Sequence, residues 1–436
     1  MEKKKILFVI DTYQTNNNGT SISAQRYAAQ LRERGHEVRI LCADEPESDS
    51  NGQLLPVEET QVYNVQEYVV PFFNKLIKKH GFYFGDIQER SQPVICKAVE
   101  WADIVHCYMP FALEMSASRY AVRIGKPCTA AFHIQPENLW SSVGLGKVQW
   151  IQDMGYQNFK NWHYYKFRHI HCVSQFMADT LLEHGYKGKL HVISNGIQEA
   201  FMIAGEKKKS IRRSRSVSES GLSSNSPKDG LFKIMMIGRL SQEKRQDVII
   251  NAVKYSKYAD RIQLVFAGKG PEYDKYVELG KDLKHQPQFI YVNRDELIEN
   301  LLDTDLYVHA SDMESEAISC IEAFATGLVP VIANSHVSAT PQFAIDGRSL
   351  FIPGDPKDLA RAIDYWLDHP GERKYMEEQY RLAGRQYSLA ASVEQFEQML
   401  NEEIQENETR VTIEPLRPLR QRESLGSRLR RVAALF

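Results

Sequence analysis

Short apolar runs alternate with amphipathic stretches along most of the chain. The first run, Lys5 to Ile10, is followed by a polar loop, an amphipathic helix that closes at Gly35 and a second apolar run. Similar pairs recur between 101 and 200 and again from 231 onward. A strand buried on both faces reads as a continuous apolar run, so the pattern predicts an α/β fold with doubly wound parallel sheets.

The length of 436 residues favours two domains rather than one. Residues 204–230 are rich in Lys, Arg and Ser and hold almost no large apolar side chains, so we expect a flexible linker there. The first domain then spans 1–203 and the second spans 231–385. We expect the helical segment 386–408 to pack back onto the first domain, and 409–436 to form a basic amphipathic tail.

Composition and charge exclude several classes of protein. The net charge of -2 argues against nucleic-acid binding. The six cysteines show no CxxC and no metal-ligand spacing, which indicates reduced core residues. No apolar stretch has the length of a signal peptide or a membrane span, so we expect a cytoplasmic protein. The tail from 416 to 436 could dock on an anionic membrane, contact a protein or stay disordered.

The most informative stretch runs from Ser311 to Pro330, where a buried strand gives way to a helix of small apolar residues. Two carboxylates, Glu314 and Glu322, lie eight residues apart there. Open α/β sheets bind ligands at the carboxyl ends of their strands. One acidic residue at a helix start could simply complement the helix dipole, but two at this spacing favour a ligand site.

Arg239 and Lys244 stand five residues apart, across a strand end and the start of the next helix. Cations at that end of a helix oppose its dipole, which weakens a purely structural interpretation. The two side chains can instead supply fixed positive charge to a diphosphate without a metal.

Backbone groups could approach the same anion. Glycines permit close approach, although a tight turn explains some of them equally well, and amides at a helix start can bind phosphate. The candidates are Gly19, Gly268, Gly270, Ala317, Ile318 and Ser319.

Four segments, GRLSQEKRQDVII, FAGKGP, MESEAISCIEA and ATGLVPVIA, occur in this order after the linker. Together they resemble the C-terminal half of the family 4 retaining glycosyltransferases. The segment DTYQTNNNGTSISAQRYAAQLRERGHEV resembles the acceptor-side opening of bacterial enzymes that glucosylate diacylglycerol. The resemblance covers about residues 4 to 400. It implies the GT-B fold, in which two Rossmann-like domains face a central cleft, and transfer of a hexose from a nucleotide-sugar with retention.

The resemblance also implies residue roles. Glu322 would accept hydrogen bonds from the ribose, and Glu314 from the hexose hydroxyls, because carboxylate oxygens suit vicinal diols. His133 matches the histidine beside the hexose and Gly19 the glycine near the diphosphate. Asn293 is expected near the base.

The chain departs from the family where Glu316 and Ala317 replace the usual Phe-Gly pair, which leaves the identity of the hexose open. We expect no cofactor, because the nucleotide-sugar is a substrate. The Asp-Thr-Asp triplet at Asp303–Asp305 resembles a metal-binding motif of other glycosyltransferases, but divalent ions need several convergent oxygens, so no metal is expected.

Three functions remain open. The first is a hexosyltransferase that moves glucose from UDP-glucose to a membrane lipid such as diacylglycerol, and the basic tail would suit it. The second is a transferase of the same fold with a soluble or polysaccharide acceptor. The third is a non-catalytic accessory subunit that binds nucleotide-sugars, against which the intact set Arg239, Lys244, Glu314 and Glu322 argues.

Overall fold

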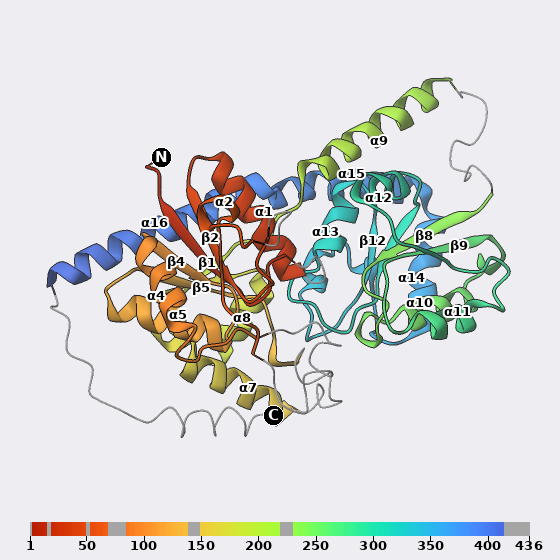
Figure 1. Ribbon diagram of the computed structural model, residues 1–436. Helices are drawn as coiled ribbons and strands as arrows, with labels where there is room; N and C mark the ends of the chain where they lie inside the picture. The colour runs from red at the N-terminus through yellow and green to blue at the C-terminus, as the bar shows by residue number, and fades with distance from the viewer. Residues whose placement is uncertain are drawn as a thin grey trace.

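The computed structural model describes residues 2–14, 19–48, 53–68, 84–137, 149–218 and 230–413. Two sheets with covering helices lie side by side in it (Figure 1). The first sheet has the strand order β3-β2-β1-β4-β5-β6-β7 and the second β10-β9-β8-β11-β12-β13. Every pairing between these strands is parallel, so the predicted pair of doubly wound domains is confirmed.

The bounds of the elements follow the chain through the two domains. The first sheet comprises β1 Lys5–Val9, β2 Glu37–Cys42, β3 Val62–Asn64, β4 Ile104–Cys107, β5 Cys128–Phe132, β6 His169–Cys172 and β7 Lys189–Val192. Its helices are α1 Gly19–Glu33, α2 Val57–Thr60, α4 Gln92–Trp101, α5 Ala112–Arg123, α7 Gln149–Trp162 and α8 Gln175–Glu183. The second sheet comprises β8 Phe232–Ile237, β9 Ile262–Ala267, β10 Gln288–Ile290, β11 Leu306–His309, β12 Pro330–Ala333 and β13 Leu350–Phe351. The remaining helices are α9 Glu199–Ser218, α10 Gln246–Val253, α11 Tyr273–Gly280, α12 Arg294–Leu302, α13 Ile318–Ala325, α14 Pro356–Asp368, α15 Pro370–Gly384 and α16 Leu389–Ile413.

Continuous burial of the strands explains both sheets. In β1 the four residues from Ile6 to Val9 are fully buried, because helices cover both faces of the sheet. Alternate residues enter different core clusters: Leu7 and Val9 pack on one face, Ile6 and Phe8 on the other. Because successive side chains of a strand point to opposite faces, one uniformly apolar run fills a core on each side of the sheet.

The helix α16 returns from the second domain and lies along the first (Figure 1). Its apolar residues Val393, Phe396 and Met399 join the core cluster of Ile6 and Phe8. The segment 386–408 thus belongs to the packing of the first domain although it follows the second in sequence.

The linker prediction is wrong for residues 204–218, which continue the helix α9. Ala204 is buried, and the Lys208 ammonium donates to the carbonyl oxygens of Leu301 at 3.4 Å and Thr304 at 3.2 Å. Lys, Arg, Glu and Ala are good helix formers, so a low apolar content did not imply an irregular chain. The rest of the predicted linker, 219–229, lies outside the described residues.

Within the ranges that the structure describes, no helix combines the length and apolarity needed to cross a membrane. The predicted tail lies outside those ranges from 414 onward. Its membrane role stays a prediction.

Helix α9 approaches α13 so closely at Gly205 that a side chain at this position would clash. A Cβ at Gly205 would lie 2.4 Å from the carbonyl oxygen of Ala325, whereas a Cβ at Gly371 would meet no atom within 4 Å. Gly→Ala in a helix normally stabilises by about 0.5–1 kcal/mol. We expect Gly205→Ala to destabilise the protein by about 1–3 kcal/mol through overpacking, measured as a lower Tm. Gly371→Ala is the matched control and should leave the Tm unchanged or raise it; equal shifts would contradict the packing.

Candidate functional site

The two domains meet at the loop between β11 and α13. The Ser315 hydroxyl donates to the backbone oxygen of His133 at 3.1 Å, and the Ser174 hydroxyl donates to the backbone oxygen of Ser315 at 2.6 Å. His133 follows β5 and Ser174 follows β6 in the first sheet, so carboxyl ends of strands from both sheets converge here. This is where parallel α/β sheets bind ligands.

Glu314 is held as an anion in this loop. His309 Nε2 lies 3.0 Å from its Oε1, and the Lys244 ammonium donates to the same oxygen. Burial raises the pKa of Glu314, but Lys244 and His309 outweigh it and hold that pKa well below its usual range. A carboxylate that stays ionised only accepts hydrogen bonds, which suits a partner rich in hydroxyl groups.

A chain of polar side chains extends from Glu314 to the start of α13. The Tyr307 hydroxyl lies 3.3 Å from His309 Nδ1 and 3.2 Å from the Ser319 hydroxyl oxygen. Because His309 Nε2 faces a carboxylate, that nitrogen carries the proton and Nδ1 is the acceptor. The predicted site residues Glu314 and Ser319 are thereby connected through two residues that the sequence analysis missed.

Two glycines hold the Arg239 loop in place. A Cβ at Gly268, whose φ is +154°, would lie 2.0 Å from the oxygen of Gly238, and a Cβ at Gly270 would lie 2.1 Å from the oxygen of Leu240. The Leu240 amide also donates to the Lys269 oxygen at 3.0 Å. The glycines therefore let the FAGKGP turn pack directly on the backbone around Arg239, whose side chain is exposed.

The helix α13 begins with a strained residue. Ala317 has φ 69° and ψ 63°, the left-handed region that glycine usually occupies, and Ile318 is the first helical residue. The family's usual glycine at this place fits that geometry. The start of α13 follows within four residues of Glu314, so its first amides and the anionic side chain lie on one short segment.

Glu322 faces the first domain from the middle of α13. Its Oε1 lies 3.3 Å from Arg26 Nη2 of α1. Burial raises the pKa of Glu322, and the Arg26 guanidinium acts against that shift. The predicted ribose ligand therefore forms an ion pair between the domains.

His133 has a buried ring nitrogen, Nε2, at this junction. Its ring stacks on Tyr108 with centroids 5.3 Å apart and planes 13° apart. Burial, and secondarily His171, lower its pKa well below the ordinary value, so the ring is neutral. Among the described residues nothing hydrogen-bonds to Nε2, which is buried. Such an atom costs free energy unless a ligand or water satisfies it.

Other predicted residues have structural partners or open surroundings. The Asn293 side-chain oxygen caps α12, accepting from the amides of Asp295 and Glu296 at 3.0 Å. A Cβ at Gly19, the first residue of α1, would meet no described atom within 4 Å.

The Asp-Thr-Asp triplet also takes part in packing contacts. Asp303 forms an ion pair with the Lys233 side chain, and Asp305 accepts from the Lys233 amide at 3.0 Å. Both carboxylates therefore help to anchor the start of β8 beside β11.

Glu316 hydrogen-bonds to the first domain. Its carboxylate accepts from the Ser194 hydroxyl, from the Asn195 amide at 3.1 Å and from the Asn195 side chain at 2.5 Å. Burial raises the pKa of Glu316 to about 7, although these hydrogen bonds lower it. The departure from the family's Phe thus forms a contact between the domains.

Sequence reasoning missed several partners of the predicted residues. His309 could have been found, because it ends a buried strand five residues before Glu314. Arg26, Ser194 and Asn195 carried no signal, since they meet their carboxylates only after the two domains dock.

Comparisons with known proteins show the family and the fold of the chain. The Glycosyltransferase Family 4 model matches residues 17–201, and the Glycosyl transferases group 1 model matches 221–383. The alpha-monoglucosyldiacylglycerol synthase of Streptococcus pneumoniae is 24% identical over 331 residues, which cover 75% of this chain and 70% of that protein. The catalytic domain of cholesterol-alpha-glucosyltransferase from Helicobacter pylori is 50% identical over 36% of this chain and 99% of its own, with a TM-score of 0.35. The UDP-glucose complex of Anabaena Alr3699/HepE is 16% identical, covers 92% of this chain and 100% of its own, and shares the fold with a TM-score of 0.63.

The raised pKa of Glu316 predicts a pH-dependent stability. Between the ordinary value of 4.5 and about 7 the unfolded chain releases the Glu316 proton and the folded chain keeps it. Stability therefore falls as pH rises through this window, by up to about 3 kcal/mol. Glu316→Gln cannot ionise, so the Tm of the wild type relative to this variant should fall from pH 4.5 to 7 and level off outside.

Glu394→Gln is the control, because Glu394 is exposed on α16. Its Tm should run parallel to that of the wild type over the same pH range. A wild-type Tm that also runs parallel to that of Glu316→Gln would show that Glu316 ionises normally in the folded protein.

Proposed function

Because the chain belongs to the family 4 glycosyltransferases of GT-B fold, we propose that it moves glucose from UDP-glucose to a hydroxyl group of a membrane lipid, with retention of configuration. The observation that supports this best is the Lys244–Glu314 pair where the domains meet. It places a cation suited to phosphate beside an anion suited to sugar hydroxyls.

The donor would exchange partners with this pair. Its diphosphate would take the Lys244 ammonium together with the exposed Arg239 guanidinium, and these charges would stabilise the departing nucleotide without a metal. Glu314 would keep its hydrogen bond with His309 and accept further hydrogen bonds from the hexose hydroxyls. His133 Nε2 is the buried nitrogen that a hexose hydroxyl would satisfy.

Retention is the expected outcome of attack on one face of the hexose. The acceptor hydroxyl would attack from the face that the nucleotide leaves, and the departing phosphate would receive its proton. No described side chain is needed as a covalent nucleophile.

The lipid acceptor rests on two observations. The relative from Streptococcus pneumoniae is named for glucosyldiacylglycerol synthesis. The sequence of this chain ends in a run that combines arginines with leucines, a composition that binds anionic membranes.

Arg239→Ala should lower kcat for UDP-glucose by at least about 100-fold, because the guanidinium would stabilise charge that develops in the transition state. Glu322→Ala should mainly raise KM for the donor, because ribose contacts are the same before and during transfer. The measurement is steady-state release of UDP, with GDP-mannose as the competing donor. Added Mg²⁺ or Mn²⁺ should not raise the rate.

Arg361→Ala and Glu278→Ala are matched controls, because both side chains lie exposed in ion pairs on other helices. They should retain wild-type kinetics. Full activity of Arg239→Ala would disprove the diphosphate assignment, and faster turnover of GDP-mannose would disprove the donor.

Acceptor choice can be measured with vesicles that contain diacylglycerol, cholesterol or neither. We expect a glycolipid product only where a lipid hydroxyl is present, and an α-linkage by proton NMR of the purified product. The full chain should float with anionic vesicles, and a chain that lacks residues 416–436 should not. If the protein transfers the hexose only to a soluble sugar and does not float with the vesicles, the lipid acceptor is wrong and the soluble acceptor is favoured.

A further inference from the structure

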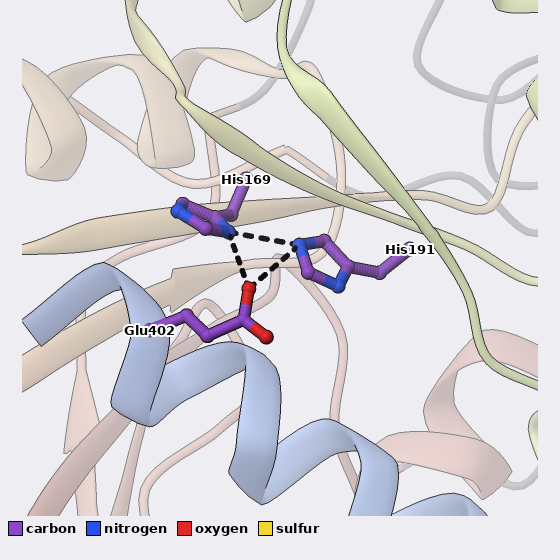
Figure 2. Close-up of side chains that lie close together, drawn as sticks. All are labelled: His169, His191 and Glu402. Carbon is purple, nitrogen blue, oxygen red and sulfur yellow. Dashed lines mark hydrogen bonds and ion pairs between the residues drawn. The ribbon is translucent and has the colours of Figure 1, made fainter. Parts of the chain in front are cut away.

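A cluster of two histidines and one glutamate lies outside the donor site. Figure 2 shows the side chains of His169, His191 and Glu402 pointing toward one another from β6, β7 and α16. His169 Nδ1 lies 2.8 Å from His191 Nε2, and Glu402 Oε2 lies 3.9 Å and 4.0 Å from these two nitrogens. Among the described residues this is the group whose ligand atoms could hold a metal ion.

We propose that His169 Nδ1, His191 Nε2 and the Glu402 carboxylate bind one Zn²⁺ ion, with water in the fourth position. Two imidazoles and one carboxylate are a ligand set that zinc accepts, whereas Mg²⁺ and Ca²⁺ prefer oxygen alone. The three ligands come from three elements that the fold has already brought together.

The distances require only a small rearrangement. Bonds of about 2.0–2.1 Å in a tetrahedron place ligand atoms about 3.3 Å apart, so the imidazoles separate by about 0.5 Å and Glu402 moves inward. His169 is fully buried, but His191 and Glu402 are partly exposed and free to adjust. On binding, the proton that His191 Nε2 shares with His169 moves through water to Nδ1 of His191, so both ligands stay neutral imidazoles. The Lys189 ammonium gives up Glu402.

A second carboxylate supports His169 as a ligand. Glu406 Oε2 lies 3.2 Å from His169 Nε2, and Glu403 Oε2 lies 3.8 Å from it. Metal-binding imidazoles generally direct their other nitrogen to a carboxylate, which fixes the tautomer and raises the basicity of the ligand nitrogen. Neither carboxylate is aligned for a hydrogen bond to His169 Nε2. The Glu406 side chain is half exposed, so a small rotation would let it accept the Nε2 proton, and Nδ1 would then face the metal with its lone pair.

The position of the cluster assigns the metal a structural role. His169 is the first residue of β6, at the amino end of the strand, whereas His133 and Ser174 lie beyond the carboxyl ends of β5 and β6. The ion would fasten α16 to two strands of the first sheet. Beside it, the Lys189–Glu402 ion pair is partly exposed and weak in salt, whereas Arg168 pairs with the buried Glu403.

The experiment uses the full chain without an affinity tag, freed of metal with a chelator. Isothermal titration with Zn²⁺ should give one site per chain, and Zn²⁺ should raise the Tm by about 2 °C or more at saturation. Mg²⁺ at the same concentration should do neither. His191→Ala and Glu402→Ala should each lose the site and the Tm shift while they fold like the wild type in the metal-free state.

Two further variants separate this site from adventitious binding. His184→Ala removes another histidine beside a carboxylate, 3.4 Å from Asp153, and should bind Zn²⁺ like the wild type. Lys189→Ala removes the cation that competes for Glu402 and should tighten binding severalfold. Absence of saturable 1:1 binding, or wild-type binding by His191→Ala, would overturn the proposal.

Discussion

Burial of three carboxylates at one junction is the constraint on which the arrangement of the two domains depends. An ionised carboxylate removed from water is costly unless charges or hydrogen-bond donors compensate it. Glu314 obtains this compensation from Lys244 and His309 within its own domain. Glu316 and Glu322 obtain it from Asn195 and Arg26 in the other domain. The stretch that contains these residues therefore forms the site only when both domains are in contact.

The same junction gives the three carboxylates different properties. The Lys244 ammonium and the His309 hydrogen bond keep Glu314 ionised, whereas the described donors to Glu316, Ser194 and Asn195, are neutral and burial raises its pKa to about 7. Glu316 is thus suited to a contact whose strength varies with pH, and Glu314 to constant hydrogen-bond acceptance. Position in the fold, rather than residue type, separates the two roles.

The helix α16 follows the second domain in sequence and packs against the first domain. Its apolar face completes a core cluster around Phe8, and its polar face carries Glu397, Glu402 and Glu403 onto basic residues and histidines. A helix that follows the second domain in sequence but packs on the first sheet links the two domains. The proposed zinc site would strengthen this same attachment.

Much of the fold could be predicted from the sequence because burial on both faces of a parallel strand leaves a continuous apolar run, a local signal. The motifs around Arg239, Gly268 and Glu314 were recognisable for a similar reason: each lies on one short segment. The linker was predicted wrongly because helix propensity outweighs low apolar content in 204–218. The cap formed by Asn293 was missed although it is local as well, because Asn293 and Glu296 have the three-residue spacing of a capping box.

The sequence by itself determined the two parallel sheets, the family resemblance and the residues that can carry negative or positive charge. Only the tertiary structure decided which charge meets which. Arg26 and Glu322 are separated by most of the chain, and so are His169 and Glu402. Pairing at such separations depends on how the domains and α16 dock, and docking is set by the summed burial of many side chains that no local pattern records.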